Sequence, residues 1–147
     1  HSEYKEETIR DGMDIALCAI DQENRKLIFS GAKNPVYIIR NETLIEIKGD
    51  KRPIGAYDEN NHIKFNNVEF ELRDGDTIYS FSDGFPDQFG GPKGKKFMYG
   101  KFKKLLIEIQ AKNMDQQREE LEKSFRAWMG DIEQVDDVLV IGVKFSC

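Results

Sequence analysis

The sequence is poor in cysteine, histidine and proline, and it has no long hydrophobic run. Its 147 residues include two cysteines, two histidines and four prolines. Cys18 and Cys147 lie near opposite ends of the chain, which excludes a disulfide scaffold and a zinc knuckle. Two free thiols are typical of a reducing, cytoplasmic compartment. No segment approaches the roughly 18–20 apolar residues that a membrane-spanning helix needs.

Positive charge is also in the minority. The chain has 22 Lys and Arg against 27 Asp and Glu, a net charge of −5. Nucleic acids and anionic membranes usually bind basic surfaces, so neither is expected as a partner. A hydrophobic content of 39% with 11% aromatic residues excludes disorder. The length suits one domain of roughly 100–200 residues. We therefore expect residues 1–147 to form a single domain that begins with a polar segment at residues 1–10.

The first half of the chain has the pattern of short strands joined by turns. The expected strands are residues 14–20, 26–29, 36–39, 43–47, 63–72 and 77–81. Gly75 marks one of the turns between them and is free to take a positive φ. The run at residues 14–20 is almost continuously apolar, which predicts a strand covered on both faces with Cys18 in the core.

The second half of the chain has a different pattern, rich in glycine at first and then helical. Residues 84–100 contain five glycines, which predicts a long loop. Apolar residues at helical spacing follow at residues 102–109. Asn113 and Gln116 predict a capping box for a second helix that stops at Gly130. A last strand is expected at residues 137–145. Hairpins first and helices grouped together predict an α+β antiparallel architecture.

Two acidic sites stand beside expected strands. Asp83 follows the strand at residues 77–81, and Asp136 precedes the last strand. If these strands are antiparallel neighbours, the two carboxylates meet at one edge of the sheet. Carboxylates without His or Cys suit hard cations, Mg²⁺ or Mn²⁺, and two such ions can activate a water and clamp a phosphoryl group. Gly84 would let the backbone approach closely. The alternative is ordinary turn chemistry, because Asp is common at strand ends.

A lysine-rich stretch lies inside the expected loop. Lys93, Lys95 and Lys96 could hold a phosphate together with backbone N–H groups. The spacing of a Walker loop is absent from the chain. The alternative is a solvated loop whose lysines remain in water.

The remaining polar candidates have less specific patterns. Asp11 and Asp14 form an acidic turn at the start of the first strand, which is either its structural entry or part of the metal site. His1 and His62 have polar sequence neighbours and no nucleophile beside them, so we expect both on the surface.

Five segments, taken in order, resemble the SpoIIE-type phosphatase domain. They are residues 11–17 (DGMDIAL), 29–40 (FSGAKNPVYIIR), 53–56 (PIGA), 74–84 (DGDTIYSFSDG) and 135–141 (VDDVLVI). This family is the bacterial branch of the metal-dependent type 2C (PPM) serine/threonine phosphatases. The resemblance implies an antiparallel β-sandwich with a helix pair on one side, a partial PPM phosphatase fold. It also implies Mn²⁺ or Mg²⁺ as cofactor, with two ions in the complete domain.

The resemblance also implies roles for individual residues. Asp83, Gly84 and Asp136 match positions that hold the metal in the family. Asp137 would support the site from behind the ligands, and Asp87 lies where the family often has a further acid. The family's first motif, Gly-Asp followed by Gly-His-Gly, is absent from this sequence. The chain therefore resembles the C-terminal part of such a domain and is expected to be inactive alone.

The function implied is that of a protein serine/threonine phosphatase in a bacterial signalling protein. The expected substrate is a phosphorylated regulator, such as an anti-sigma-factor antagonist, and an upstream sensor domain would control the enzyme. The alternative is a non-catalytic pseudophosphatase that acts as an interaction domain. A domain without its first helix pair would expose apolar sheet surface, which predicts a homodimer through that face.

Overall fold

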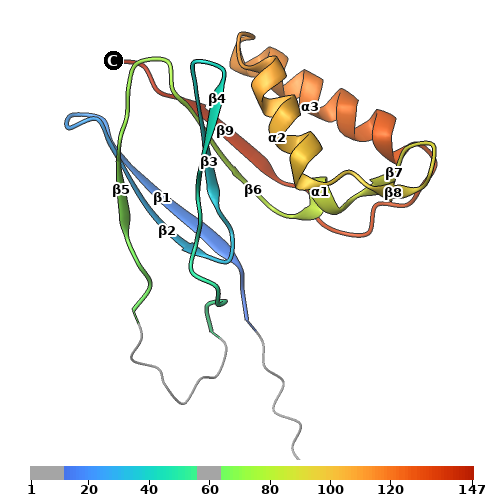
Figure 1. The fold of residues 1–147 in the computed structure, drawn as a ribbon, viewed down its shortest axis with the longest axis horizontal. Helices are drawn as coiled ribbons and strands as arrows, with labels where there is room; N and C mark the ends of the chain where they lie inside the picture. The colour runs from blue at the N-terminus through green and yellow to red at the C-terminus, as the bar shows by residue number, and fades with distance from the viewer. Residues whose placement is uncertain (1–11, 56–63) are drawn as a thin grey trace, which may run out of the picture.

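Two antiparallel sheets form the body of the molecule. The computed structural model describes residues 12–55 and 64–147 (Figure 1). The three-stranded sheet has the order β1 (Ile15–Asp21), β2 (Lys26–Ala32), β5 (Val68–Glu71). The four-stranded sheet has the order β4 (Thr43–Ile47), β3 (Val36–Arg40), β6 (Thr77–Phe81), β9 (Val140–Lys144). The remaining elements are α1 (Gly84–Asp87), the hairpin of β7 (Phe89–Gly90) with β8 (Lys95–Lys96), α2 (Tyr99–Ile109) and α3 (Met114–Met129).

The two sheets pack face to face. Phe29 of β2 and Ile38 of β3 belong to the same buried cluster between them. Successive side chains of a strand point to opposite faces, so Tyr37 and Ile39 face away from the sandwich and into a second cluster. β3 is consequently covered on both faces.

Helices α2 and α3 cover the outer face of the four-stranded sheet (Figure 1). Phe102 and Leu106 of α2 and Leu121 of α3 are buried against that sheet. The architecture is thus the expected α+β sandwich with a helix pair on one side. Among the described residues, none of the helices has both the length and the apolar character needed to cross a membrane.

Several local expectations are confirmed. The Asn113 side chain accepts a hydrogen bond from the Gln116 N–H at 2.9 Å, and the Gln116 side chain accepts one from the Asn113 N–H at 3.2 Å. This capping box starts α3, and Gly130 ends it with φ 54°. Gly75 has φ 88° in the turn between β5 and β6.

The expectation that the first strand is covered on both faces is wrong. β1 lies at an edge of its sheet, and the side chain of Leu17 is 63% exposed. Cys18, expected in the core, is only partly buried at the margin of the sandwich cluster. Its burial raises the pKa of the thiol. A continuous apolar run does not reveal which strand is covered on both faces, and that strand is β3 of the other sheet.

The expected long loop at residues 84–100 is also wrong, since α1, the β7–β8 hairpin and the start of α2 occupy it. The glycines there allow close packing. A Cβ on Gly90 would lie 1.8 Å from the Trp128 carbonyl oxygen. The Gly91 N–H donates to that same oxygen at 2.8 Å, and Trp128 Nε1 donates to the Gln88 carbonyl at 3.0 Å. The last strand begins at Val140, later than residue 137.

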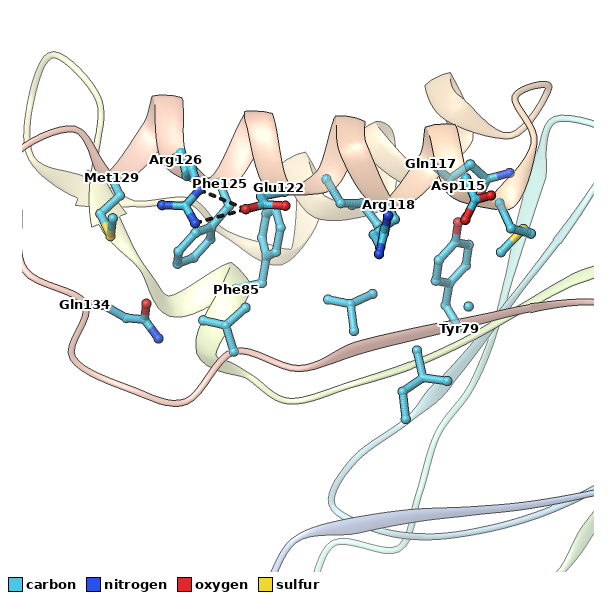
Figure 2. A pocket seen from close by; sticks show the side chains of 16 residues that line it. Tyr79, Phe85, Asp115, Gln117, Arg118, Glu122, Phe125, Arg126, Met129 and Gln134 are labelled. Carbon is cyan, nitrogen blue, oxygen red and sulfur yellow. Dashed lines mark hydrogen bonds and ion pairs between the residues drawn. The ribbon is translucent and has the colours of Figure 1, made fainter.

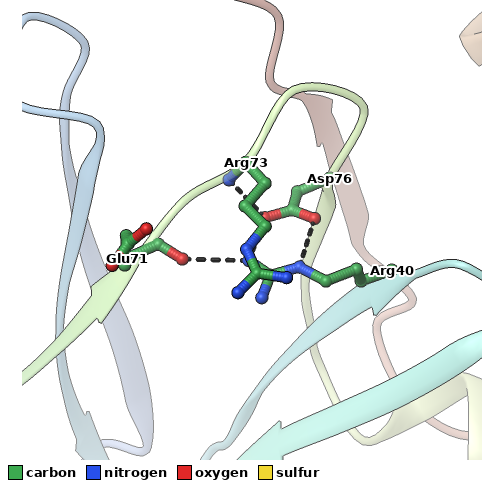
Figure 3. Close-up of polar contacts among 4 residues, drawn as sticks. All are labelled: Arg40, Glu71, Arg73 and Asp76. Carbon is green, nitrogen blue, oxygen red and sulfur yellow. Dashed lines mark hydrogen bonds and ion pairs between the residues drawn. The ribbon is translucent and has the colours of Figure 1, made fainter.

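A buried ion pair lies at one end of the sandwich, where its arginine also links the two sheets (Figure 3). Arg40 donates to the two carboxylate oxygens of Asp76 at 2.9 and 2.6 Å and to the Glu71 carbonyl at 2.9 Å. The Arg73 N–H also donates to Asp76, at 2.8 Å. Burial raises the pKa of Asp76, but the hydrogen bonds from Arg40 and Arg73 outweigh it and hold that pKa below its usual value.

Candidate metal centre

The end of β6 meets the start of β9. The two strands are antiparallel neighbours, with Phe81 opposite Val140, as the sequence predicted. The turn after β6 carries Asp83, and the segment before β9 carries Asp136 and Asp137. Two acidic motifs far apart in sequence therefore lie side by side.

Ser82 and Gly84 hold these two segments together. The Ser82 hydroxyl donates to the Asp137 carbonyl at 2.9 Å and accepts from the Leu139 N–H at 3.0 Å. The Ser82 N–H donates to the Leu139 carbonyl at 2.9 Å. A Cβ on Gly84 would lie 2.2 Å from the Asp137 carbonyl oxygen. A larger residue at position 84 would push the segments apart.

The carboxylates of Asp83 and Asp136 interact directly. Partial burial raises the pKa of Asp83, and the nearby charge of Asp136 and a hydrogen bond with its side chain raise it further. The charges of Asp87 and Asp14 act in the same direction. Asp83 is the N-cap of α1, yet its side chain makes no capping hydrogen bond. The carboxylate thus faces other negative groups, an arrangement that a bound cation would relieve.

The donor set suits a hard cation but is small. Within residues 12–55 and 64–147, no group of three or more His, Cys, Asp or Glu side chains is placed to hold a metal. Mg²⁺ is often bound by one or two carboxylates and keeps several waters, so Asp83 and Asp136 fit part of such a shell. A tighter site needs ligands in addition to these two.

Asp136, Asp137 and Asp87 differ in their surroundings. The Asp136 carboxylate accepts a hydrogen bond from the Asp137 N–H at 2.8 Å, which orients it. The Asp137 backbone carbonyl accepts the hydrogen bond from the Ser82 hydroxyl, and the Asp137 side chain is exposed. Asp87 lies at the end of α1, and its N–H donates to the Asp83 carbonyl at 2.9 Å. Lys96 forms an ion pair with the Asp87 carboxylate at 3.5 Å.

The three lysines of the predicted phosphate loop lie on or beside the β7–β8 hairpin. Asp83, Asp87 and Asp136 are called the acidic cluster below. Lys96 contacts this cluster through its ion pair with Asp87. Lys93 and Lys95 are exposed, and neither forms an ion pair within the described part of the chain. The hairpin therefore brings one positive charge, that of Lys96, next to Asp87 at the end of α1.

Sequence reasoning missed Tyr99, the first residue of α2. Burial raises the pKa of its phenol, and the charges of Asp87, Asp83 and Glu46 raise it further. Tyr99 therefore lies close to the candidate metal ligands. Nothing in the local sequence distinguished it from other aromatic residues, because its position depends on how α2 packs beside α1. Ser82 was missed as well, although it directly precedes Asp83.

One hollow of the described structure is separate from the acidic pair. It is a cleft of about 600 Å³ between α3 and β9, with Tyr79, Phe85 and Phe125 among its lining residues (Figure 2). Asp83 and Asp136 do not line it. A smaller hollow of about 270 Å³ lies over residues 134–137 and does include Asp136.

Three candidates of the sequence lie outside the described residues. They are Asp11, His1 and His62, and the same holds for the polar segment 1–10. Asp14 is described, is exposed, and contributes its charge to the surroundings of Asp83.

Comparison with known families identifies the domain. The family model described as Stage II sporulation protein E (SpoIIE) matches residues 2–146. The chain belongs to the SpoIIE family. No curated protein matches this SpoIIE-family chain in a search of its sequence.

Solved structures show the same fold. The SiaA-PP2C domain of Pseudomonas aeruginosa is 31% identical, with a TM-score of 0.83 over 90% of this chain and 52% of that one. The phosphatase domain of SpoIIE from Bacillus subtilis is 17% identical, with a TM-score of 0.68 over 91% and 59%. The serine/threonine phosphatase PstP/Ppp of Mycobacterium tuberculosis is 14% identical, with a TM-score of 0.63 over 92% and 61%.

These matches confirm the resemblance seen in the sequence. The chain has the fold of PP2C phosphatase domains and is homologous to the SiaA-PP2C domain. It spans about half of the length of the SiaA-PP2C domain. One of the matched Bacillus subtilis SpoIIE structures was presoaked with Mn.

Proposed function

We propose that this SpoIIE-family chain supplies part of the metal centre of a protein serine/threonine phosphatase. The observation that carries the proposal is the convergence of Asp83 and Asp136 at the junction of β6 and β9. The raised pKa of Asp83 supports it, since structural carboxylates are usually compensated by a partner, and here the neighbours are acids.

Each residue of the centre has a proposed role. Asp83 and Asp136 would hold Mn²⁺ or Mg²⁺, beside the backbone of Gly84, with two ions in a complete domain. Such an ion, when bound, neutralises charge on a phosphoryl group and makes a water more acidic. The Asp137 N–H orients the Asp136 carboxylate. Ser82 fixes the distance between the two segments through its hydroxyl.

The substrate class is proposed from the likeness to the family. We infer that the substrate is a phosphoserine or phosphothreonine regulatory protein, such as an anti-sigma-factor antagonist. A sensor domain in a longer parent chain would control the reaction in the cytoplasm.

A pseudophosphatase that binds a partner without hydrolysis is the second candidate. The observation in its favour is that the described residues offer no third carboxylate, His or Cys placed to complete a metal shell. Such a domain would keep the fold and the partner surface.

Two measurements separate the candidates. Calorimetric titration of the 147-residue chain with Mn²⁺ is expected to show at most one weakly bound ion. Its hydrolysis of p-nitrophenyl phosphate with Mn²⁺ should not exceed that with a chelator. The full-length protein should hydrolyse the same compound, and Asp83→Asn or Asp136→Asn should abolish that activity. The matched control is Asp131→Asn, which changes an exposed carboxylate after α3.

Two outcomes would overturn parts of this proposal. Turnover by the 147-residue chain itself, lost in Asp83→Asn, would show either that the first catalytic segment is not missing from it or that another residue, such as Asp11 or Asp14, replaces the missing ligand. A full-length protein that binds its partner but never hydrolyses a phosphomonoester would establish the pseudophosphatase.

A further inference from the structure

Three apolar side chains are exposed beside the acidic cluster. They belong to Phe89 of β7, Met98 and Tyr99, and together we call them the ledge. Phe89 and Tyr99 are each 41% exposed, and Met98 is 59% exposed. The ledge spans the base of the β7–β8 hairpin and the start of α2. The Lys96–Asp87 ion pair connects this hairpin to α1, which begins directly after Asp83.

Met98 is held in an unfavourable backbone conformation. Its φ of 78° and ψ of 149° lie in a region that residues with a Cβ seldom adopt. Hydrogen bonds fix it there: the Met98 N–H donates to the Pro86 carbonyl at 2.8 Å, and the Met98 carbonyl accepts from Phe102 at 3.2 Å. Glycine would suit this position better. The chain instead has a large apolar side chain that packs into neither core cluster, and such outliers point to function.

The hairpin that carries the ledge is firmly seated. The Phe97 side chain is buried, with its ring centroid 5.2 Å from that of Phe85 and 5.4 Å from that of Trp128. The Phe97 N–H donates to the Gln88 carbonyl at 2.9 Å, and the Gly91 N–H donates to the Trp128 carbonyl at 2.8 Å. The ledge thus has a fixed position relative to α1 and Asp83.

Four lysines lie on the β7–β8 hairpin and the start of α2, the same elements that carry the ledge. Lys93 and Lys95 are exposed and, among the described residues, form no ion pair. Lys96 forms an ion pair with Asp87, and the Lys101 ammonium lies 4.0 Å from the centre of the Trp128 ring. This patch is positive on a chain whose net charge is −5. Because the acidic pair repels anions, such a patch offsets that repulsion for a negatively charged ligand.

We propose that the ledge and its lysines dock an acidic segment of the phosphoprotein substrate, with an apolar side chain of that segment on Met98. The proposal rests on the proposed phosphatase function and specifies the substrate class: a phosphorylated site flanked by Asp or Glu and at least one aliphatic residue. Lysines supply charge complementarity and faster encounter, and the ledge supplies apolar contact.

Binding to the 147-residue chain tests the charge component. The probe is a fluorescein-labelled phosphoserine peptide with acidic flanks and one leucine, followed by fluorescence anisotropy. Lys93→Glu/Lys95→Glu is expected to weaken binding at least tenfold. Lys48→Glu/Lys123→Glu makes the same charge change at exposed sites away from the hairpin and should stay within twofold. A peptide with lysine flanks should bind the parent chain at least tenfold more weakly. Equal losses in both double variants would overturn the proposal.

Met98 tests the apolar component. Met98→Gly removes the side chain and relieves the backbone strain at this position, so it should raise the melting temperature. The same variant should bind the acidic phosphopeptide severalfold more weakly. Leu17→Ser is the control, since it removes an equally exposed apolar side chain from β1. It should leave peptide binding unchanged. A Met98→Gly chain that is more stable and binds the peptide as well as the parent would refute a docking role.

The full-length protein distinguishes failure of docking from failure of the phosphatase proposal. If Lys93→Glu/Lys95→Glu lowers kcat/KM for the phosphopeptide but not for p-nitrophenyl phosphate, docking is supported. If neither changes, docking is wrong and the phosphatase stands. If nothing is hydrolysed yet peptide binding depends on the ledge, docking stands and the phosphatase is wrong. A single-stranded oligonucleotide that binds the parent chain more tightly than the acidic peptide would overturn docking of a protein segment.

Discussion

Breaking the Arg40–Asp76 pair should destabilise the sandwich without touching the acidic cluster. Asp76 is 1% exposed and accepts three hydrogen bonds, two of them from Arg40. Removing one partner of a buried pair typically costs roughly 3–5 kcal/mol, because the other charge is left uncompensated. The Arg40 side chain is 17% exposed and would keep its hydrogen bond to the Glu71 carbonyl without Asp76. Both features favour a loss of stability at the lower end of that range. We expect Asp76→Ala to cost about 3 kcal/mol, or roughly 6–12 °C in Tm for a domain of this size.

The assay is urea unfolding of the parent chain, Asp76→Ala, Arg40→Met and the double variant. The double variant should lose less than the sum of the single losses, because it leaves no unpaired charge. The lowered pKa of Asp76 means that the pair stabilises the fold above the ordinary carboxyl range, and that this stability is lost as pH falls through the folded-state pKa. The Asp76→Ala variant should therefore lack the acid-sensitive part of the unfolding free energy. A loss below about 1 kcal/mol, the range of exposed pairs, or an unchanged acid response would refute the reasoning.

Three further perturbations have definite outcomes. The raised pKa of Asp83 predicts that the metal-free chain loses stability as pH rises through that pKa, so Asp83→Asn should raise Tm at pH 7 but not at pH 3. Gly84→Ala forces a Cβ to 2.2 Å from the Asp137 carbonyl and should cost about 1–3 kcal/mol in urea unfolding, whereas Gly100→Ala meets nothing within 4 Å and should be neutral or stabilising. The exposed Leu17 predicts a dimer by light scattering at high concentration, reduced in Leu17→Lys; a monomer at every concentration would contradict it.

The sequence predicted those elements whose signals are local. Turn residues and alternating apolar positions located most of the strands of both sheets, and the Asn113–Gln116 pair located the start of α3. The placement of Asp83 beside Asp136 could also be predicted from the sequence, because Asp83 follows one strongly β-patterned segment and Asp136 precedes another. Antiparallel pairing of those two segments was the only additional assumption, and β6 and β9 do pair.

What the sequence could not predict depends on contacts between distant segments. Glycine has two uses, conformational freedom and close approach, and a sequence does not distinguish them. Gly90 is the clear case: the carbonyl that would meet its Cβ belongs to Trp128, which lies at the far end of α3 in sequence. The exposure of Leu17 is similar, since it depends on which strand lies at the sheet edge. Tyr99 reaches the acidic cluster only because α2 starts beside α1.

β6 has a carboxylate near each end, and their surroundings separate a structural acid from a functional one. Asp76, before the strand, is buried against Arg40, and its pKa is lowered. Asp83, after the strand, faces Asp136, and its pKa is raised. The first arrangement stabilises the protein. The second destabilises the metal-free chain, and a cation bound there would relieve that destabilisation. Because both acids flank the same strand, the contrast reflects their partners rather than their residue type or element. The uncompensated pair is therefore where a cation, and with it the phosphoryl group of a substrate, should be sought.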